Sequence, residues 1–450
     1  MFSIVVFRSV LFAFLVVWQG CVVWQKVQIV GKDSDKFLFL GENSYICRML
    51  RVRMRVAHTY YNVEMRRTNT IGFDAKHATT GDATLCSYAL FIIEAMAKAC
   101  PRRSYFRMYV PDDDTTPDYE SLAQRHNVES MEPDGALWRK LWWLWRLYFI
   151  GRDLKRGDVE LFHSLTEFVP FGLERRGIRS IVTVHSLEFL RLKGLFGPLH
   201  SMFRRVVMLS SLRRSDRIVA VSENIKNDLI KYLHIDRDKI DVIYRGCHPR
   251  FIHPVSPERQ REVEERYHLP KRYMLFVGTH MPRKNLGDLI EIMPKLDRDV
   301  ELVIVGRATT YTQRIKHRIK SLDLQERVHM LYGVADDDMP AVYAGASLYL
   351  MPSLYEGFPP TIIEALTLGV PVIAAKGSSM EEAGGPNSIY VDSNDRDAWE
   401  RAIKEVLGNE ELRNYMISEG RNYVSRFRPE VVAYNIMNCY KRIGVDISEY

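Results

Sequence analysis

Residues 352–366 read Pro-Ser-Leu-Tyr-Glu-Gly-Phe-Pro-Pro-Thr-Ile-Ile-Glu-Ala-Leu, and this stretch is the most informative part of the chain. It predicts a loop followed by a helix, because proline is tolerated in the first turn of a helix, where its missing N–H is not needed. Residues 368–371, Leu-Gly-Val-Pro, end that helix with a glycine at the C-cap and a proline beyond it. Glu356 therefore lies in the loop, and Glu364 lies about one turn inside the helix.

The start of this helix is suited to an anion, because its first N–H groups are unbonded and the helix dipole is positive there. The two carboxylates can accept hydrogen bonds from hydroxyl groups on either side of a bound phosphate. The pattern predicts a site for a sugar joined to a nucleotide through a diphosphate. The alternative is a surface loop before an ordinary amphipathic helix, with Glu364 solvated.

A second segment, residues 276–286, reads Phe-Val-Gly-Thr-His-Met-Pro-Arg-Lys-Asn-Leu. A strand leads into a glycine turn at Gly278 and Thr279, and two cations, Arg283 and Lys284, precede a helix. Cations neutralise the charge of a departing diphosphate. Two basic residues before a helix are often simply solvated, but beside the first stretch this pair predicts a diphosphate clamp.

Short apolar runs alternate with helical segments in two series, which predicts two buried parallel sheets. The runs are 71–74, 105–110, 159–163, 180–185, 217–222 and 240–244, then 273–278, 300–306, 328–331, 348–351 and 371–375. They predict an α/β protein with two doubly wound, Rossmann-like domains facing each other across a cleft. The expected divisions are 1–65 as an N-terminal extension, 66–254 and 255–426 as the two domains, and 427–450 as a C-terminal helix. The polar stretch 255–270 is expected to link the domains.

Glu356 and Glu364, with Gly357-Phe358-Pro359-Pro360 after the first glutamate, resemble the E-x7-E motif of retaining GT-B glycosyltransferases of family 4. The resemblance implies transfer of a sugar from a nucleoside diphosphate to a glycan or lipid-linked acceptor, without a cofactor. It also implies a role in bacterial surface polysaccharide or lipopolysaccharide synthesis. The first domain would hold the acceptor and the second the donor, and the last helix would return to the first domain.

The resemblance also implies a set of site residues. Residues 182–189 are similar to a strand-end His-Asp-Leu motif of the family, with Ser186 in place of the aspartate. The resemblance implies that His185 approaches the donor sugar. The alternative is that His185 is a structural histidine. Many relatives carry arginine where this chain has Thr279. The implied catalytic residues are Glu356, His185 and Lys284, and the implied donor-binding residues are Arg283, Gly278, Thr279, Gly357, Phe358 and Glu364. Ser222 is predicted to cap a helix.

One motif departs from the family. Relatives carry a Gly-x-Gly-x-Tyr loop after the first strand, and here residues 81–88 place Thr84 and Cys86 at the two glycine positions. Side chains there would obstruct close approach of the backbone to a phosphate. This departure motivates one alternative, a non-catalytic sugar-nucleotide-binding scaffold. A nucleotide-sugar epimerase or a phosphorylase-like enzyme is the other.

Composition fits this picture. A chain of 450 residues suggests two domains, and a net charge of +7 suits an anionic donor or an anionic membrane face. We expect no nucleic-acid partner, and a cytoplasmic protein with possible peripheral contact with the inner membrane. The six cysteines are scattered, which predicts reduced thiols without zinc or disulfides. The runs 112–114 and 336–338 imitate the D-x-D metal motif, but the first lies in a polar loop and the second can cap a helix, so no metal is expected.

Two further segments leave alternatives open. Residues 10–18 are apolar and resemble a signal-peptide core or a short anchor, although a span needs about 20 apolar residues. The preferred hypothesis is a mis-assigned start, with the protein beginning near Met65 or Met54, and the alternative is a membrane anchor. Residues 137–150 carry tryptophans and a tyrosine among arginines and leucines, which fits a helix core or an acceptor- or membrane-facing surface.

Overall fold

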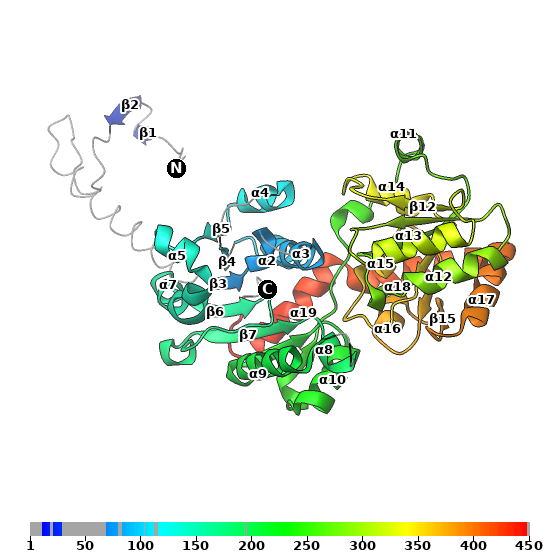
Figure 1. Ribbon diagram of the computed structural model, residues 1–450. Coiled ribbons are helices and arrows are strands. Elements are labelled where there is room, and N and C mark those ends of the chain that lie inside the picture. The colour runs from blue at the N-terminus through cyan, green and yellow to red at the C-terminus, as the bar shows by residue number, and fades with distance from the viewer. Residues whose placement is uncertain are drawn as a thin grey trace. The chain divides into compact units, whose positions relative to one another are not determined.

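The computed structural model describes residues 11–18, 21–28, 69–79, 83–102, 104–111, 116–192, 194 and 196–447, the first two ranges by their backbone alone (Figure 1). The chain divides into two compact units, Met1–Arg67 and Thr68–Tyr450. In the first unit, β1 (Leu11–Trp18) and β2 (Cys21–Gln28) pair antiparallel. The rest of the predicted extension, including both candidate start residues, lies outside the described residues. None of the described helices is long and apolar enough to cross a bilayer.

The second unit contains two parallel sheets. The seven strands of the first are β3 (Asn69–Asp74), β4 (Ser104–Tyr109), β5 (Val128–Met131), β6 (Val159–Ser164), β7 (Arg179–Val184), β8 (Arg217–Ala220) and β9 (Ile240–Val242). Their order across the sheet is β5-β4-β3-β6-β7-β8-β9. The six strands of the second are β10 (Tyr273–Val277), β11 (Glu301–Val305), β12 (Val328–Leu331), β13 (Leu348–Met351), β14 (Val372–Ala375) and β15 (Ile389–Val391), in the order β12-β11-β10-β13-β14-β15. We call the two sheets with their helices the first lobe and the second lobe.

Helices surround both sheets. Those of the first lobe are α2 (Lys76–Thr79), α3 (Ala83–Ala99), α4 (Pro117–Ala123), α5 (Ala136–Lys140), α6 (Trp142–Leu144), the π-helix η1 (Trp145–Phe149), α7 (Ile150–Arg156), η2 (Glu174–Arg176), α8 (Glu188–Arg191), α9 (Pro198–Arg214), α10 (Glu223–Leu233), η3 (Arg237–Lys239) and η4 (Pro249–Phe251). Those of the second lobe are α11 (Pro257–Tyr267), η5 (Pro282–Lys284), α12 (Leu286–Ile292), η6 (Met293–Lys295), α13 (Thr312–Ser321), α14 (Met339–Ala344), α15 (Pro360–Thr367), α16 (Met380–Gly384), α17 (Arg396–Gly408), α18 (Glu410–Val424) and η7 (Ser425–Phe427).

Both sheets have the doubly wound strand order, which confirms the predicted fold class. The order reverses between β3 and β6 in the first sheet and between β10 and β13 in the second. Such a switch point is where open α/β sheets bind ligands, beyond the carboxyl ends of the strands. The polar stretch expected to be a linker contains the helix α11, whose Val263 is fully buried.

The last helix, α19 (Pro429–Lys441), packs on the first lobe beside α3. The Sγ atom of Cys100 lies 3.4 Å from the Sδ atom of Met437, and the hydroxyl of Tyr440 lies 2.8 Å from Nδ1 of His163 on β6. Figure 1 shows α19 in red among elements of the first lobe. The chain therefore crosses between the lobes twice, before α11 and before α19.

The aromatic segment 137–150 divides into short helices with two environments. Trp145 is buried and donates from Nε1 to Asp153 at 2.7 Å, and the rings of Trp138 and Phe149 lie 4.6 Å apart. Trp143 and Tyr148 are exposed on the surface of the lobe. The prediction of a helix core therefore holds for part of the segment, and the rest is exposed surface.

Candidate functional site

Two loops meet at the switch point of the second sheet, one after β10 and one after β13. The first begins at Gly278, whose N–H donates to the carbonyl of Val305 at 2.9 Å. Gly306, at the end of the neighbouring β11, must be a glycine, because a Cβ atom there would lie 1.9 Å from the Gly278 carbonyl oxygen. The backbone N–H of Leu354 donates to the carbonyl of Arg283 at 2.8 Å and joins the two loops.

Glu356 lies at the centre of the site, between two cations. Its Oε1 atom is 2.8 Å from Nζ of Lys284 and 2.9 Å from a terminal nitrogen of Arg283. Burial would raise the pKa of Glu356, but Lys284 and Arg283 outweigh this effect, so its pKa lies below the usual value. The carboxylate is therefore ionised, and the structure brings Glu356 to the adjacent cations Arg283 and Lys284, which lie far from it in the sequence.

The backbone of Glu356 is fixed by the turn after β14. Its N–H donates to the hydroxyl of Ser378 at 3.0 Å, and its carbonyl accepts from the hydroxyls of Ser378 at 3.2 Å and Ser379 at 2.9 Å. These two serines received no role from the sequence. Their position next to the site follows from the pairing of β14 with β13.

Glu364 lies on the first turns of α15, apart from the cation pair. Its Oε2 atom accepts a hydrogen bond of 2.8 Å from the hydroxyl of Tyr343 on α14, and burial raises its pKa. This environment contradicts the alternative of a freely solvated glutamate. Glu356 and Glu364 thus differ in their direct partners, because the first bonds two cations and the second bonds a phenol.

His185 follows β7 and comes from the first lobe. Its Nε2 atom lies 2.8 Å from the carbonyl of Leu165, and its ring meets Tyr88 edge to face at 4.6 Å. Burial lowers the pKa of His185 to about 4, so the ring is neutral at pH 7. Because a carbonyl can only accept, Nε2 carries the proton and Nδ1 remains an acceptor.

The loop that carries Glu356 touches the first lobe directly. A Cβ atom on Gly357 would lie 1.7 Å from the carbonyl oxygen of His185, so only glycine fits there. The carbonyl of Gly357 accepts from the hydroxyl of Ser222 at 2.8 Å. Ser222 also accepts from the N–H of Ile225 at 3.1 Å, which confirms the predicted helix cap.

Further contacts join the lobes here. Glu188, on α8, lies 3.0 Å from Nε of Arg283, so this arginine contacts a carboxylate from each lobe. Tyr355 donates to Asp228 at 3.2 Å. The sequence indicated no role for Glu188, although it stands three residues after His185.

The remaining predicted residues have other surroundings. Phe358 packs in an aromatic cluster, 5.1 Å from the ring of Tyr244, rather than beside the cations. Thr279 is half-buried directly after Gly278. Thr84 and Cys86 lie in the first turns of α3, so their assignment to a glycine-rich loop was wrong. Residues 80–82, before that helix, lie outside the described residues.

Acidic side chains elsewhere are held by cations. Asp338 is fully buried and bonds Arg266 at 2.8 Å and Tyr267 at 2.7 Å. The sequence suggested that this acidic run caps α14, but the side chain of Asp338 makes no capping hydrogen bond. Residues 112–114 lie outside the described part of the chain. Within that part, no group of three His, Cys, Asp or Glu side chains could hold a metal ion.

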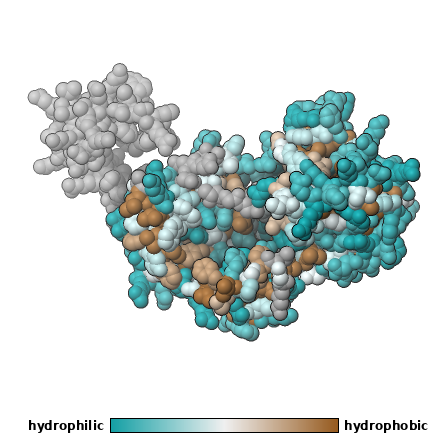
Figure 2. Space-filling view, viewed as in Figure 1, coloured by the Kyte–Doolittle hydropathy of each residue, from teal (hydrophilic) through white to brown (hydrophobic). Residues whose placement is uncertain are grey.

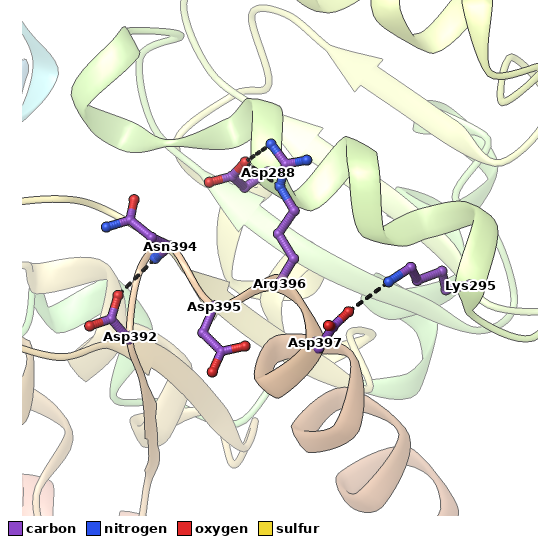
Figure 3. A pocket seen from close by; sticks show the side chains of 7 residues that line it. All are labelled: Asp288, Lys295, Asp392, Asn394, Asp395, Arg396 and Asp397. Atoms are coloured by element: carbon purple, nitrogen blue, oxygen red, sulfur yellow. Dashed lines mark hydrogen bonds and ion pairs between the residues drawn. The ribbon is translucent and has the colours of Figure 1, made fainter.

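A polar hollow of about 810 Å³ lies at the start of α17 (Figure 3). Its charges are paired within it: Asp288 with Arg396 at 2.7 Å and Lys295 with Asp397 at 2.7 Å. Asp395 caps α17 by accepting from the N–H of Ala398 at 2.9 Å. These charged groups therefore have structural partners, and the hollow needs no ligand to explain them.

Comparisons with known proteins agree with this fold. The family description "Glycosyltransferase Family 4" matches residues 92–251, and "Glycosyl transferases group 1" matches residues 258–423. The chain is 26% identical over 286 residues to O-antigen chain mannosyltransferase B of Escherichia coli, covering 62% of this chain and 74% of that protein. It is 27% identical over 288 residues to O-antigen chain mannosyltransferase RfbU of Salmonella typhimurium, covering 64% and 75%.

Solved structures share the fold. HepE of Anabaena in complex with UDP has a TM-score of 0.65 at 18% identity and covers 83% of this chain and 100% of its own. WaaG, a glycosyltransferase involved in lipopolysaccharide biosynthesis, has a TM-score of 0.61 at 14% identity and covers 84% and 100%. At identities of 18% and 14%, the similarity to these structures shows the fold alone.

Proposed function

This chain belongs to glycosyltransferase family 4, with the GT-B fold, and from that premise we propose that it moves a hexose from a nucleoside diphosphate to a glycan or lipid-linked acceptor in bacterial surface polysaccharide synthesis. The observation that carries the proposal is the convergence of Lys284 and Arg283 on Glu356, beside a glycine turn at the switch point. Two cations at such a place suit a diphosphate.

Each site residue has a proposed task. Lys284 and Arg283 hold the diphosphate and stabilise the charge that grows on it as the bond to the sugar breaks. The ionised Glu356 accepts hydrogen bonds from sugar hydroxyls, and Glu364 does so from the ribose. Neutral His185 offers Nδ1 to a hydroxyl of the donor sugar. Gly278 and Thr279 border the phosphates, and no cofactor or metal takes part.

The reaction balances without a side-chain nucleophile. The bond between the anomeric carbon and the diphosphate oxygen breaks, and the acceptor oxygen bonds to the same carbon. The acceptor's proton passes to the departing phosphate oxygen. We propose that the configuration is retained, which means that the acceptor attacks on the face that the diphosphate leaves. The anomeric coupling constant of the product tests this proposal directly.

The first experiment measures thermal stabilisation by UDP, GDP, ADP and their sugar conjugates. Mannose conjugates come first, because two relatives are named mannosyltransferases. A ligand at 100 times its Kd adds about 2.7 kcal/mol of stability. We expect one base to stabilise the protein and Lys284→Ala to abolish the effect. The matched control is Lys404→Ala, which removes an exposed ion pair of the same 2.8 Å length to Glu400.

Three outcomes contradict the proposal. Equal stabilisation of the Lys284→Ala variant refutes the assigned site, and stabilisation by no nucleotide refutes the donor class. Nucleotide binding without transfer to any acceptor extract favours a binding scaffold.

We place the reaction in the cytoplasm, with the protein in peripheral contact with the inner membrane, where a lipid-linked acceptor would lie.

A further inference from the structure

Helix α9 turns an apolar stripe toward solvent. Leu199, Met202, Phe203 and Val206 follow the spacing i, i+3, i+4, i+7, which places them on one face of the helix. Their exposed fractions are 76%, 60%, 68% and 61%. The opposite face is the buried one and carries Met208, Ser211 and Leu212. An ordinary surface helix has polar residues where this one has the stripe, so something apolar is expected to cover it.

The charged residues of the segment that carries the stripe have one sign, although Arg191 and Arg204 are paired with Asp228 and Glu167 of neighbouring elements. Between Glu188 and Asp216 the sequence has no acidic residue, whereas it has six arginines and lysines: Arg191, Lys193, Arg204, Arg205, Arg213 and Arg214. Arg205 and Arg213 are exposed on α9 itself. A helix with an apolar face and exclusively basic charges fits a surface that is apolar inside and anionic outside.

The neighbouring surface extends the pattern. The rings of Tyr148 and Phe171 stack at 5.2 Å, and the guanidinium of Arg214 lies 4.0 Å over Phe171, which joins the end of α9 to η1. Figure 2 shows apolar side chains gathered over α9 and over α5 on the first lobe, while the visible face of the second lobe is mainly hydrophilic. The apolar surface therefore belongs to the lobe proposed to hold the acceptor.

We propose that α9 docks the protein on an anionic phospholipid bilayer, with the stripe inserted among the acyl chains and Arg205 and Arg213 at the lipid phosphates. This inference deepens the peripheral membrane contact proposed above and rests on it. A second copy of the chain fits the surface less well. Two stripes pairing would bring like charges together, and four side chains are few beside the roughly 20–30 residues per side of a stable interface.

The test is flotation of the full-length protein with vesicles of phosphatidylcholine, with or without an equal part of phosphatidylglycerol. We expect binding to the anionic vesicles that weakens as salt rises. The double variant Leu199→Glu, Phe203→Glu should bind at least about tenfold more weakly. Arg213→Gln alone should weaken binding by about fivefold. The matched control, Tyr415→Glu with Tyr434→Glu, replaces two exposed aromatic residues on α18 and α19 with the same charges and should bind like the unchanged protein.

Each other outcome overturns the inference in a distinct way. If the unchanged protein binds no vesicle, the membrane contact itself is wrong. If the stripe variant binds as well as the unchanged protein, another part of the chain makes the contact. If the control weakens equally, added charge is the cause. If light scattering shows a dimer that the stripe variant lacks, the stripe joins copies of the chain. Nucleotide stabilisation, measured on the same variants, separates all of these from failure of the donor site.

Discussion

Replacement of Gly357 by alanine tests how the two lobes cooperate. The new methyl carbon would lie 1.7 Å from the carbonyl oxygen of His185, whereas real Cβ atoms essentially never come closer than 3.0 Å to another heavy atom. The two backbones must therefore separate by roughly 1.3 Å. Because they belong to different lobes, the lobes can move apart without disturbing either core.

Gly306→Ala provides the contrasting clash. Its Cβ atom would lie 1.9 Å from the carbonyl oxygen of Gly278, which stands at the end of the neighbouring strand in the same sheet. No movement of the lobes relieves this contact, so the strain stays in the second lobe. Overpacking of this kind costs about 1–3 kcal/mol, and each kcal/mol lowers the Tm of a lobe of this size by about 2–4 °C.

The two variants are expected to separate activity from stability. Gly357→Ala should change Tm by less than about 2 °C. Its transfer rate should fall about 100-fold, because a displacement of 1 Å misplaces Glu356 relative to His185. Gly306→Ala should lower Tm by several degrees. Gly408→Ala, in open space at the end of α17, is the control and should not lower Tm.

Calorimetry and a donor-transfer assay on the purified variants give the comparison. A Gly357→Ala variant that loses as much thermal stability as Gly306→Ala refutes the idea that the lobes relieve the clash. A Gly357→Ala variant with full activity refutes the claim that the contact with His185 positions Glu356.

Three further predictions follow from the site. Tyr343→Phe removes the hydrogen bond to Glu364 and should weaken nucleotide binding about tenfold by calorimetric titration; unchanged affinity would place Glu364 outside the site. Glu188→Gln frees Arg283 from a competing carboxylate and should strengthen nucleotide binding about two- to fivefold, whereas weaker binding would make Glu188 a ligand contact. The unfolding free energy should fall as pH drops from 6.5 toward 4, because the pKa of folded His185 is lowered to about 4. In that window the unfolded side chain takes up a proton that the folded one does not bind. Thermal melts of His185→Asn should show a smaller change of stability with pH over the same window.

The central strands could be predicted because burial on both faces makes them continuous apolar runs. The central strand β13 begins and ends at the predicted residues, and so does β12, which lies at a sheet edge. β5 and β15 were missed, and both lie at sheet edges. β5 reads Val-Glu-Ser-Met and β15 has three residues, so neither carries a long apolar run. These two edge strands obtain their order from the neighbouring strand, whereas the edge strands β9 and β12 carry apolar runs of their own and were predicted.

The site was predictable to the extent that topology determines it. Loops after β10 and β13 must lie together once β10 and β13 are adjacent, and this brings Lys284 to Glu356. The contacts of Ser378 and Glu188 depend instead on the conformations of turns and on packing between the lobes. The loop expected at Thr84 and Cys86 was wrong because both residues already belong to α3.

The paired state of the cations has a consequence for the donor. Lys284 and Arg283 are already neutralised by Glu356 and, for Arg283, also by Glu188. On the proposed site, binding of a diphosphate is thus an exchange of anions, in which the incoming phosphates replace carboxylates. Glu356, once released, has acceptor atoms for sugar hydroxyls, and release of Glu188 loosens a contact between the lobes. One exchange therefore links leaving-group binding, sugar orientation and lobe movement.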